Sequence, residues 1–225
     1  LSDSLTKLVP FSHQHLFNQQ SSIACQGYLI FTSDRGLCGG YNINLFKYLE
    51  SKIRADSMVW VVGAKGLQHF KMLDRFQLEY LGALSDKTVV REASGIAKLL
   101  TASFQSAQVG ELYVGYNKFV NRVTQHPTLT RLLPFEAVQK ENQPRYEYEP
   151  TVSEVVDQFF NAQLVGYIYE VLLEAKVSEL AAKVTAMGNA TDNVQELKEE
   201  LGMQYNRLRQ MLITQEIAEI VGGMG

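Results

Sequence analysis

The chain has 225 residues, 46% of them hydrophobic and 20% charged, with a formal net charge of −3 at pH 7. This composition is typical of a globular protein with enough apolar residues for one sizeable core. It argues against a nucleic-acid-binding protein, because Lys and Arg do not cluster among aromatics, and against a transmembrane helix, because no run of 18 apolar residues exists. Any membrane association is therefore expected to be peripheral.

Residues 1–26 are expected to contain the end of a helix and a linker. Leu1, Leu5 and Leu8 recur at helical spacing before Pro10. Because the chain opens on Leu1 rather than on a methionine, we interpret it as a fragment or as a chain without its native start.

Residues 27–134 alternate between strand and helix patterns, which predicts an α/β domain with a small open Rossmann-like sheet and helices on its faces. Strands are predicted at 28–32, 58–62, 77–81 and 111–116, and helices at 42–54, 64–73 and 88–107. Residues 122–133 follow the fourth strand without an intervening helix, so this fifth strand should be antiparallel. Pro127 lacks an N–H, so it should lie at an edge or a bulge.

A glycine-rich turn at residues 32–40 separates the first strand from the first helix. Such turns often bind phosphate on backbone N–H groups. The spacing Gly-x-x-Gly-Gly matches neither the dinucleotide fingerprint nor the phosphate loop, so we favour a structural turn in which Asp34 and Arg35 bond each other or nearby backbone. The residues of this turn motif are Asp34, Arg35, Gly36, Gly39 and Gly40.

The sequence contains no motif typical of a catalytic, cofactor or metal site. Cys25 and Cys38 match no ligand spacing and are expected to be free thiols in a reducing compartment. The pair His13 and His15 lacks a third ligand at regular spacing, so we expect no metal there.

Residues 135–150 are polar and predict a linker, and residues 151–225 predict one very long helix. Thr151 and Glu154 form a capping box after Pro150, and no break follows before Gly222. About 70 helical residues span ~105 Å, whereas a domain built from the remaining residues measures only about 35 to 40 Å. The helix should therefore protrude as a shaft.

An apolar seam runs along this helix at heptad spacing, which predicts half of a left-handed coiled coil. No second helix of matching length exists in the chain, so we expect the seam to lack a partner within it. Apolar residues near the end occupy more than one side, so the tip should sit inside a sleeve of other subunits. The seam consists of Leu173, Val177, Leu180, Val184, Met187, Val194, Leu201, Tyr205, Leu208 and Leu212.

Three segments resemble the γ subunit of F-type ATP synthases, the central rotor shaft. TSDRGLCGGYNINLFK (32–47) is similar to the most recognisable internal motif of that family, and LAAKVTAMGNATDN (180–193) and ITQEIAEIVGG (213–223) are similar to its C-terminal helix. The resemblance covers almost the whole chain. The family's N-terminal helix, which pairs antiparallel with the C-terminal one, would be largely missing, with its end at residues 1–9.

The resemblance implies a non-catalytic rotor subunit that couples rotation of an ion-driven c ring, powered by H⁺ or Na⁺, to ATP synthesis or hydrolysis. It implies α and β subunits around the shaft and the ε subunit and c ring at its foot, with no cofactor, at the cytoplasmic face of the bacterial inner membrane or, in a eukaryote, the matrix side. By position, contacts to the β-subunit catch loops would be made by Lys183, Gln210, Thr214 and Glu216, and foot contacts by Tyr148 and Glu149.

This sequence departs from the family pattern at three positions. Lys183 stands where arginine is usual, so its contact would be a point charge rather than a bidentate fork. Gly188 replaces a usual basic residue and Met224 a usual alanine. These differences leave open a paralogous shaft or scaffold in another motor, and the glycine-rich turn leaves open a nucleotide-binding α/β enzyme.

Overall fold

Five strands form a single sheet in the order β3-β2-β1-β4-β5. The computed structural model describes residues 25–83, 89–134 and 151–223. Strand β1 lies between β2 and β4 and is parallel to both, β3 is parallel to β2, and β5 is antiparallel to β4. The strands are β1 (Gln26–Phe31), β2 (Met58–Val62), β3 (Gln77–Gly82), β4 (Glu111–Phe119) and β5 (Gln125–Leu133).

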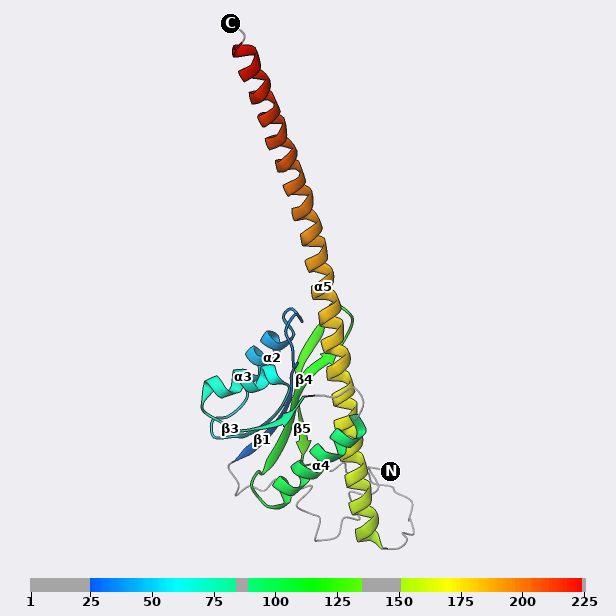
Figure 1. The fold of residues 1–225 in the computed structure, drawn as a ribbon. Helices are drawn as coiled ribbons and strands as arrows, with labels where there is room; N and C mark the ends of the chain where they lie inside the picture. The colour runs from blue at the N-terminus through cyan, green and yellow to red at the C-terminus, as the bar shows by residue number, and fades with distance from the viewer. Residues whose placement is uncertain (1–24, 84–88, 135–150, 224–225) are drawn as a thin grey trace.

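Helices cover both faces of this sheet because its central strands are apolar on both sides (Figure 1). Within β1, Leu29 and Phe31 enter the core on one face, and Tyr28 and Ile30 enter the core on the other. Helices α2 (Tyr41–Glu50) and α3 (Ala64–Leu73) cover the Tyr28 face. Helix α4 (Val89–Gln105) and the first part of α5 (Val152–Gly222) cover the Leu29 face.

The predicted α/β fold is confirmed, and local hydrogen bonds explain where element ends differ. The first helix ends at Glu50, before the predicted residue 54, and a tighter turn follows in which the Lys52 N–H donates to the Leu49 carbonyl three residues back. The fifth strand begins at Gln125, after the predicted residue 122, because the Asn121 side chain accepts from the N–H groups at 123 and 124 and forms a turn. Pro127 lies on the edge strand β5, as predicted.

Helix α5 has 71 residues and begins at a side-chain cap. The Thr151 hydroxyl accepts from the Glu154 N–H at 3.3 Å, which satisfies one free donor of the first turn. Every residue from Met187 to Gly223 is exposed, and this part projects well beyond the α/β domain (Figure 1). Within the described residues, no helix combines the length and the apolar character needed to cross a bilayer.

Among the described residues, the expectation that the apolar stripe of this helix lacks a partner holds for only one of two stripes. Leu164, Ile168 and Ala175 are buried in the core against β4 and α4. Leu173, Val177 and Leu180, on another side of the same turns, remain 39%, 47% and 52% exposed. Because 3.6 residues make one turn, the two sets follow different faces. The sequence pattern showed the exposed seam and missed the buried face.

We expect Gly63→Ala to destabilise the domain strongly and Gly95→Ala to stabilise it. Gly63 has φ +100, and a Cβ there would lie 2.2 Å from the Thr32 carbonyl oxygen, so the substitution should cost about 3 kcal/mol or more. A Cβ at Gly95, inside α4, would meet no atom within 4 Å, so alanine should gain about 0.5–1 kcal/mol. Urea unfolding followed by circular dichroism measures both free energies. Equal effects of the two substitutions would contradict the packing around Gly63.

Candidate interaction surface

The glycine-rich turn caps helix α3 with its own side chains. The Asp34 carboxylate accepts from the Ala64 N–H at 3.1 Å, and the Thr32 hydroxyl accepts from the Gly66 N–H at 3.0 Å. These N–H groups form the positive end of the helix, where α/β proteins commonly bind phosphate. Side chains of the turn therefore occupy the place where a phosphate would bind at the start of α3. The Asp34 carboxylate bonds the backbone N–H of Ala64 rather than the Arg35 side chain.

The same turn is fixed on its other side by helix α2. The Asn42 side chain accepts from the Ser33 N–H at 3.1 Å and donates to the Ser33 hydroxyl at 2.6 Å. Gly39 has φ +55, a left-handed conformation that favours glycine. A Cβ at Gly40 would lie 2.9 Å from the flexible Asn44 side chain, and a Cβ at Gly36 would meet nothing within 4 Å. Among the three motif glycines, only Gly39 is required by its backbone conformation.

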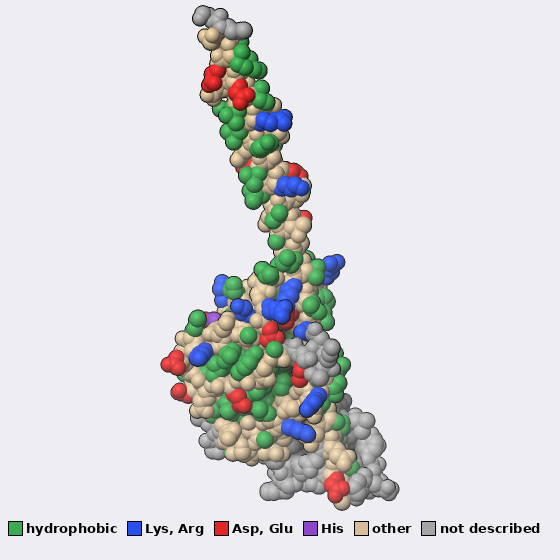
Figure 2. Space-filling view, in the orientation of Figure 1, with side chains coloured by type: hydrophobic (Ala, Val, Ile, Leu, Met, Phe, Trp, Pro, Cys, Tyr) green, Lys and Arg blue, Asp and Glu red, His purple; other side chains and the backbone are tan. Residues whose placement is uncertain are grey.

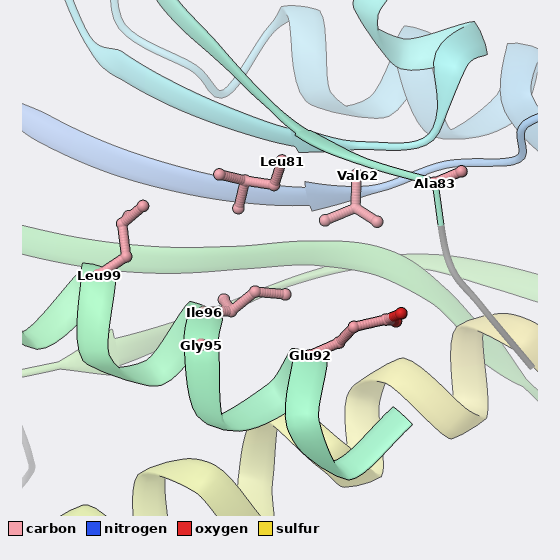
Figure 3. Close-up of a pocket in the computed structure, with 7 residues that line it drawn as sticks. All are labelled: Val62, Leu81, Ala83, Glu92, Gly95, Ile96 and Leu99. Carbon is pink, nitrogen blue, oxygen red and sulfur yellow. The ribbon is translucent and has the colours of Figure 1, made fainter. Parts of the chain in front are cut away.

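A cavity of about 270 Å³ lies between α4 and the carboxyl ends of β2 and β3 (Figure 3). Open α/β sheets usually bind ligands outside the carboxyl ends of their strands. Among the described residues that line it, Glu92 carries the one charged side chain, and a carboxylate does not attract a phosphate. The described lining therefore gives no support for a nucleotide site. It is lined by Val62, Leu81, Ala83, Glu92, Gly95, Ile96 and Leu99.

The described residues contain no group of three or more His, Cys, Asp and Glu side chains that could hold a metal ion. Cys25 and Cys38 are both free thiols. The pair His13 and His15 lies outside the part of the chain that the structure describes. The described residues therefore give no candidate for a catalytic, metal or nucleotide site. The exposed surface of α5 is the candidate interaction surface instead.

The free part of α5 exposes large apolar side chains along its whole length (Figure 2). Their exposed fractions range from 47% for Ile213 to 68% for Met203 and Val221, and a soluble chain rarely leaves so many apolar side chains in contact with water without a partner. We call this set the exposed shaft surface. From Val194 onward it comprises Val194, Leu197, Leu201, Met203, Tyr205, Leu208, Met211, Leu212, Ile213, Ile217, Ile220 and Val221.

The predicted contact residues at the tip do not share one face. Gln210 and Thr214 lie one helical turn apart on the same side, and the Thr214 hydroxyl donates to the Gln210 carbonyl at 2.8 Å. Glu216 follows Thr214 by two residues, so it points to the opposite side of the helix. All three side chains are exposed.

Lys183 lies far from these tip residues. About 40 Å of helix separates it from Gln210, and its ammonium pairs with the Glu179 carboxylate, whose side chain is only 8% exposed. The structure therefore places Lys183 where α5 leaves the α/β domain. Tyr148 and Glu149, the predicted foot residues, lie outside the described residues.

A set of buried polar residues near Glu179, the partner of Lys183, was not predicted from the sequence. Tyr41, Asn117 and Glu179 are 4%, 1% and 6% exposed and come from α2, β4 and α5. Small residues at helical spacing in α5, including Ala175 and Ala182, are the sequence signal for this contact. Small side chains allow a second element to approach the helix closely.

The ATP synthase family model matches residues 1–225. The chain is 38% identical over 218 residues to the ATP synthase gamma chain of Brevibacillus brevis, covering 93% of this chain and 76% of the relative. It is 40% identical over 200 residues to the ATP synthase gamma chain of Desulfitobacterium hafniense, covering 88% and 71%.

Solved structures share the fold. A chain in the Euglena gracilis mitochondrial ATP synthase, in a complex of OSCP, F1 and c-ring, aligns with a TM-score of 0.70 at 20% identity, covering 98% of this chain and 82% of that one. A chain in the central stalk and c-ring of the Tetrahymena thermophila mitochondrial ATP synthase gives a TM-score of 0.63 at 22% identity, covering 84% and 92%.

We expect Asp34→Ala to destabilise the domain by about 1 kcal/mol, because α3 loses a side-chain acceptor at its first turn. Asp192→Ala is the matched control, since Asp192 is exposed on the free part of α5 and its loss should change stability by less than about 0.5 kcal/mol. Urea unfolding measures both values. A smaller effect at Asp34 than at Asp192 would contradict the capping role.

Proposed function

Because the chain belongs to the ATP synthase γ-chain family, we propose that α5 is the rotating shaft that couples ion-driven rotation to ATP synthesis and hydrolysis. The γ subunit is a non-catalytic part of the synthase. One observation carries the proposal: a helix of 71 residues leaves its domain and exposes apolar side chains along its free part. Such a surface suits a rod enclosed by other subunits.

The α and β subunits surround the exposed shaft surface, and the ε subunit and the c ring contact the opposite end of the molecule. Support for these partners comes from the similar chain of Euglena gracilis, which is part of a complex with F1 and a c-ring. Within this arrangement, Gln210, Thr214 and Glu216 contact the β-subunit loops, and Tyr148 and Glu149 contact the foot partners. Lys183, paired with buried Glu179 beside the domain, is the weakest of the predicted hexamer contacts.

The shaft drives conformational change because its sides differ. Gln210 and Thr214 occupy one side of the tip and Glu216 the opposite side. At any angle of rotation, the three β subunits therefore meet different groups, and each angle favours a different conformation in each site. Rotation then interconverts their nucleotide affinities, and ATP hydrolysis turns the shaft in the reverse direction by the same linkage.

A second helix packs along the seam that starts at Leu173. Heptad spacing and exposure of Leu180, Val184 and Met187, at 52%, 53% and 49%, support this pairing. The N-terminal helix of the γ family is the expected partner. Together, the two helices form a stiff antiparallel coiled coil, since a lone helix exposed to water is only marginally stable.

The γ subunit is a peripheral, membrane-associated part of the complex. We place it on the cytoplasmic face of the bacterial inner membrane, since the two relatives named above are bacterial, or on the matrix side if the source is mitochondrial. Either H⁺ or Na⁺ suits this role, because the ion would pass through the membrane subunits and not through this chain.

We expect Leu201→Asp to disrupt assembly of the complex without unfolding the α/β domain. Leu201 is 54% exposed in the chain, so a carboxylate there costs little until a second helix and the hexamer cover it, when burial of the charge becomes costly. Asn193→Asp adds the same charge at an exposed polar position of the same segment and should assemble normally. Gel filtration of the tagged complexes compares them, and equal assembly would contradict burial of the seam.

The whole proposal is tested by purifying the chain from its own cells through an affinity tag. We expect α, β, ε and c subunits to copurify, and ATP to turn a bead attached to the α/β domain while the hexamer is fixed to glass. Recovery of a hexameric motor without ε or a c ring would favour the paralogous shaft. Tight ATP binding by the isolated chain would favour the nucleotide-binding enzyme.

A further inference from the structure

The glycine-rich turn lies directly against the shaft. Cys38 and Tyr41 form a buried cluster with Ala182, and a Cβ at Gly39 would lie 3.7 Å from the Cβ of Ala186. Such close approach is possible because α5 carries small residues on this side. The most recognisable motif of the chain therefore occupies the place where the helix leaves the domain.

Hydrogen bonds join the two bodies at this place. The Tyr41 hydroxyl donates to the Ala175 carbonyl of α5 at 3.0 Å, and the Asn117 side chain of β4 donates to the Tyr41 carbonyl at 2.9 Å. Burial raises the pKa of the Tyr41 hydroxyl, and the nearby Glu179 carboxylate acts in the same direction. The hydroxyl therefore keeps its proton and remains a donor across the physiological range.

Two further contacts lie next along the helix. The Thr185 hydroxyl donates to the Arg122 carbonyl, in the loop between β4 and β5, at 2.8 Å. Lys183 pairs with the buried Glu179 on the same helix, which neutralises a carboxylate beside Tyr41. We call Tyr41, Asn117, Glu179, Lys183 and Thr185 the junction.

Polar contacts fix the rotation of α5 about its own axis, which apolar packing alone does not. The hydrophobic effect is non-directional, so an apolar helix face permits small rotations of the helix about its own axis. Hydrogen bonds weaken steeply away from their preferred distance and angle. A buried bond from Tyr41 to the helix backbone therefore specifies one angle between α5 and the sheet.

We propose that the junction locks the angle of the shaft to the α/β domain and thereby transmits torque between them, with Tyr41 as the main positioning residue. This inference rests on the proposed rotor function. Its chemistry is an internal lock, not a binding site, and it gives the glycine-rich turn a mechanical role. Torque that reaches the domain from the foot passes to α5 without slipping.

The first test compares Tyr41→Phe with Tyr28→Phe in the intact complex. Tyr28 is the matched control, because its buried hydroxyl donates to Gln26 at 2.6 Å within the domain and its core cluster contains no residue of α5. For Tyr41→Phe we expect amide exchange of residues 175–186 to accelerate about five-fold, the effect of losing one net hydrogen bond. Ion-driven ATP synthesis should fall while ATP hydrolysis is retained.

Tyr28→Phe should change neither the exchange at 175–186 nor the ratio of synthesis to hydrolysis. If the two variants give the same ratio of ATP synthesis to ATP hydrolysis in complexes that assemble and hydrolyse ATP, the proposed lock is wrong. The proposed rotor function is then unaffected. If neither the variants nor the wild-type chain assemble with α and β, the proposed function itself fails.

The second test replaces Gly39 and Ala186 by cysteine, and the reduced form of the same variant is the reference, because it carries the same backbone strain at position 39 (φ +55). Their Cβ separation of 3.7 Å lies within the range of about 3.5–4.5 Å for disulfides, and mass spectrometry distinguishes this bridge from one to Cys38. The oxidised complex should hydrolyse ATP at the rate of the reduced one. In the Tyr41→Phe background, the bridge should restore ion-driven ATP synthesis. Loss of turnover on oxidation, recovered with reductant, would show that turn and shaft must move relative to each other and would overturn the lock.

Discussion

The burial of one face of α5 against β4 and α4 is the interaction on which the rest of the structure depends. Apolar residues between Leu164 and Ala175 enter the same core as the sheet, so this part of the helix is stabilised by tertiary packing rather than by propensity alone. The free part then extends from a fixed base. Without that base, only the contacts of the junction would hold the helix to the domain.

Helix α5 carries two apolar stripes, one that packs on its own domain and one that is exposed and available to other molecules. The buried stripe holds the rod on the sheet, and the exposed stripe starts on a different side at Leu173 and continues past the end of the domain. Because both stripes belong to one continuous hydrogen-bonded helix, a rotation at one end is carried along the backbone to the other. The junction around Tyr41 lies where the first stripe gives way to the second.

Much of this architecture follows from local sequence patterns, and the parts that do not are contacts between distant residues. Apolar runs such as residues 58–62 predict the strands, and the capping box at Thr151 predicts where the long helix begins. The partner of Asp34, by contrast, is Ala64, which reaches it only because β1 and β2 are neighbours. Tyr41 and Ala175 are still further apart in sequence. No periodicity in either segment encodes such a pair.

The exposure of every residue from Met187 to Gly223 has a consequence for the life of the chain in a cell. A newly made copy exposes a long apolar helix to proteases, chaperones and other nascent chains until its partners enclose it. This part of the helix has few tertiary contacts to prevent local unfolding. Synthesis in excess of the other subunits would therefore be wasteful, and surplus copies would be cleared. The same surface that serves the finished machine thus ties the abundance of this chain to that of its neighbours.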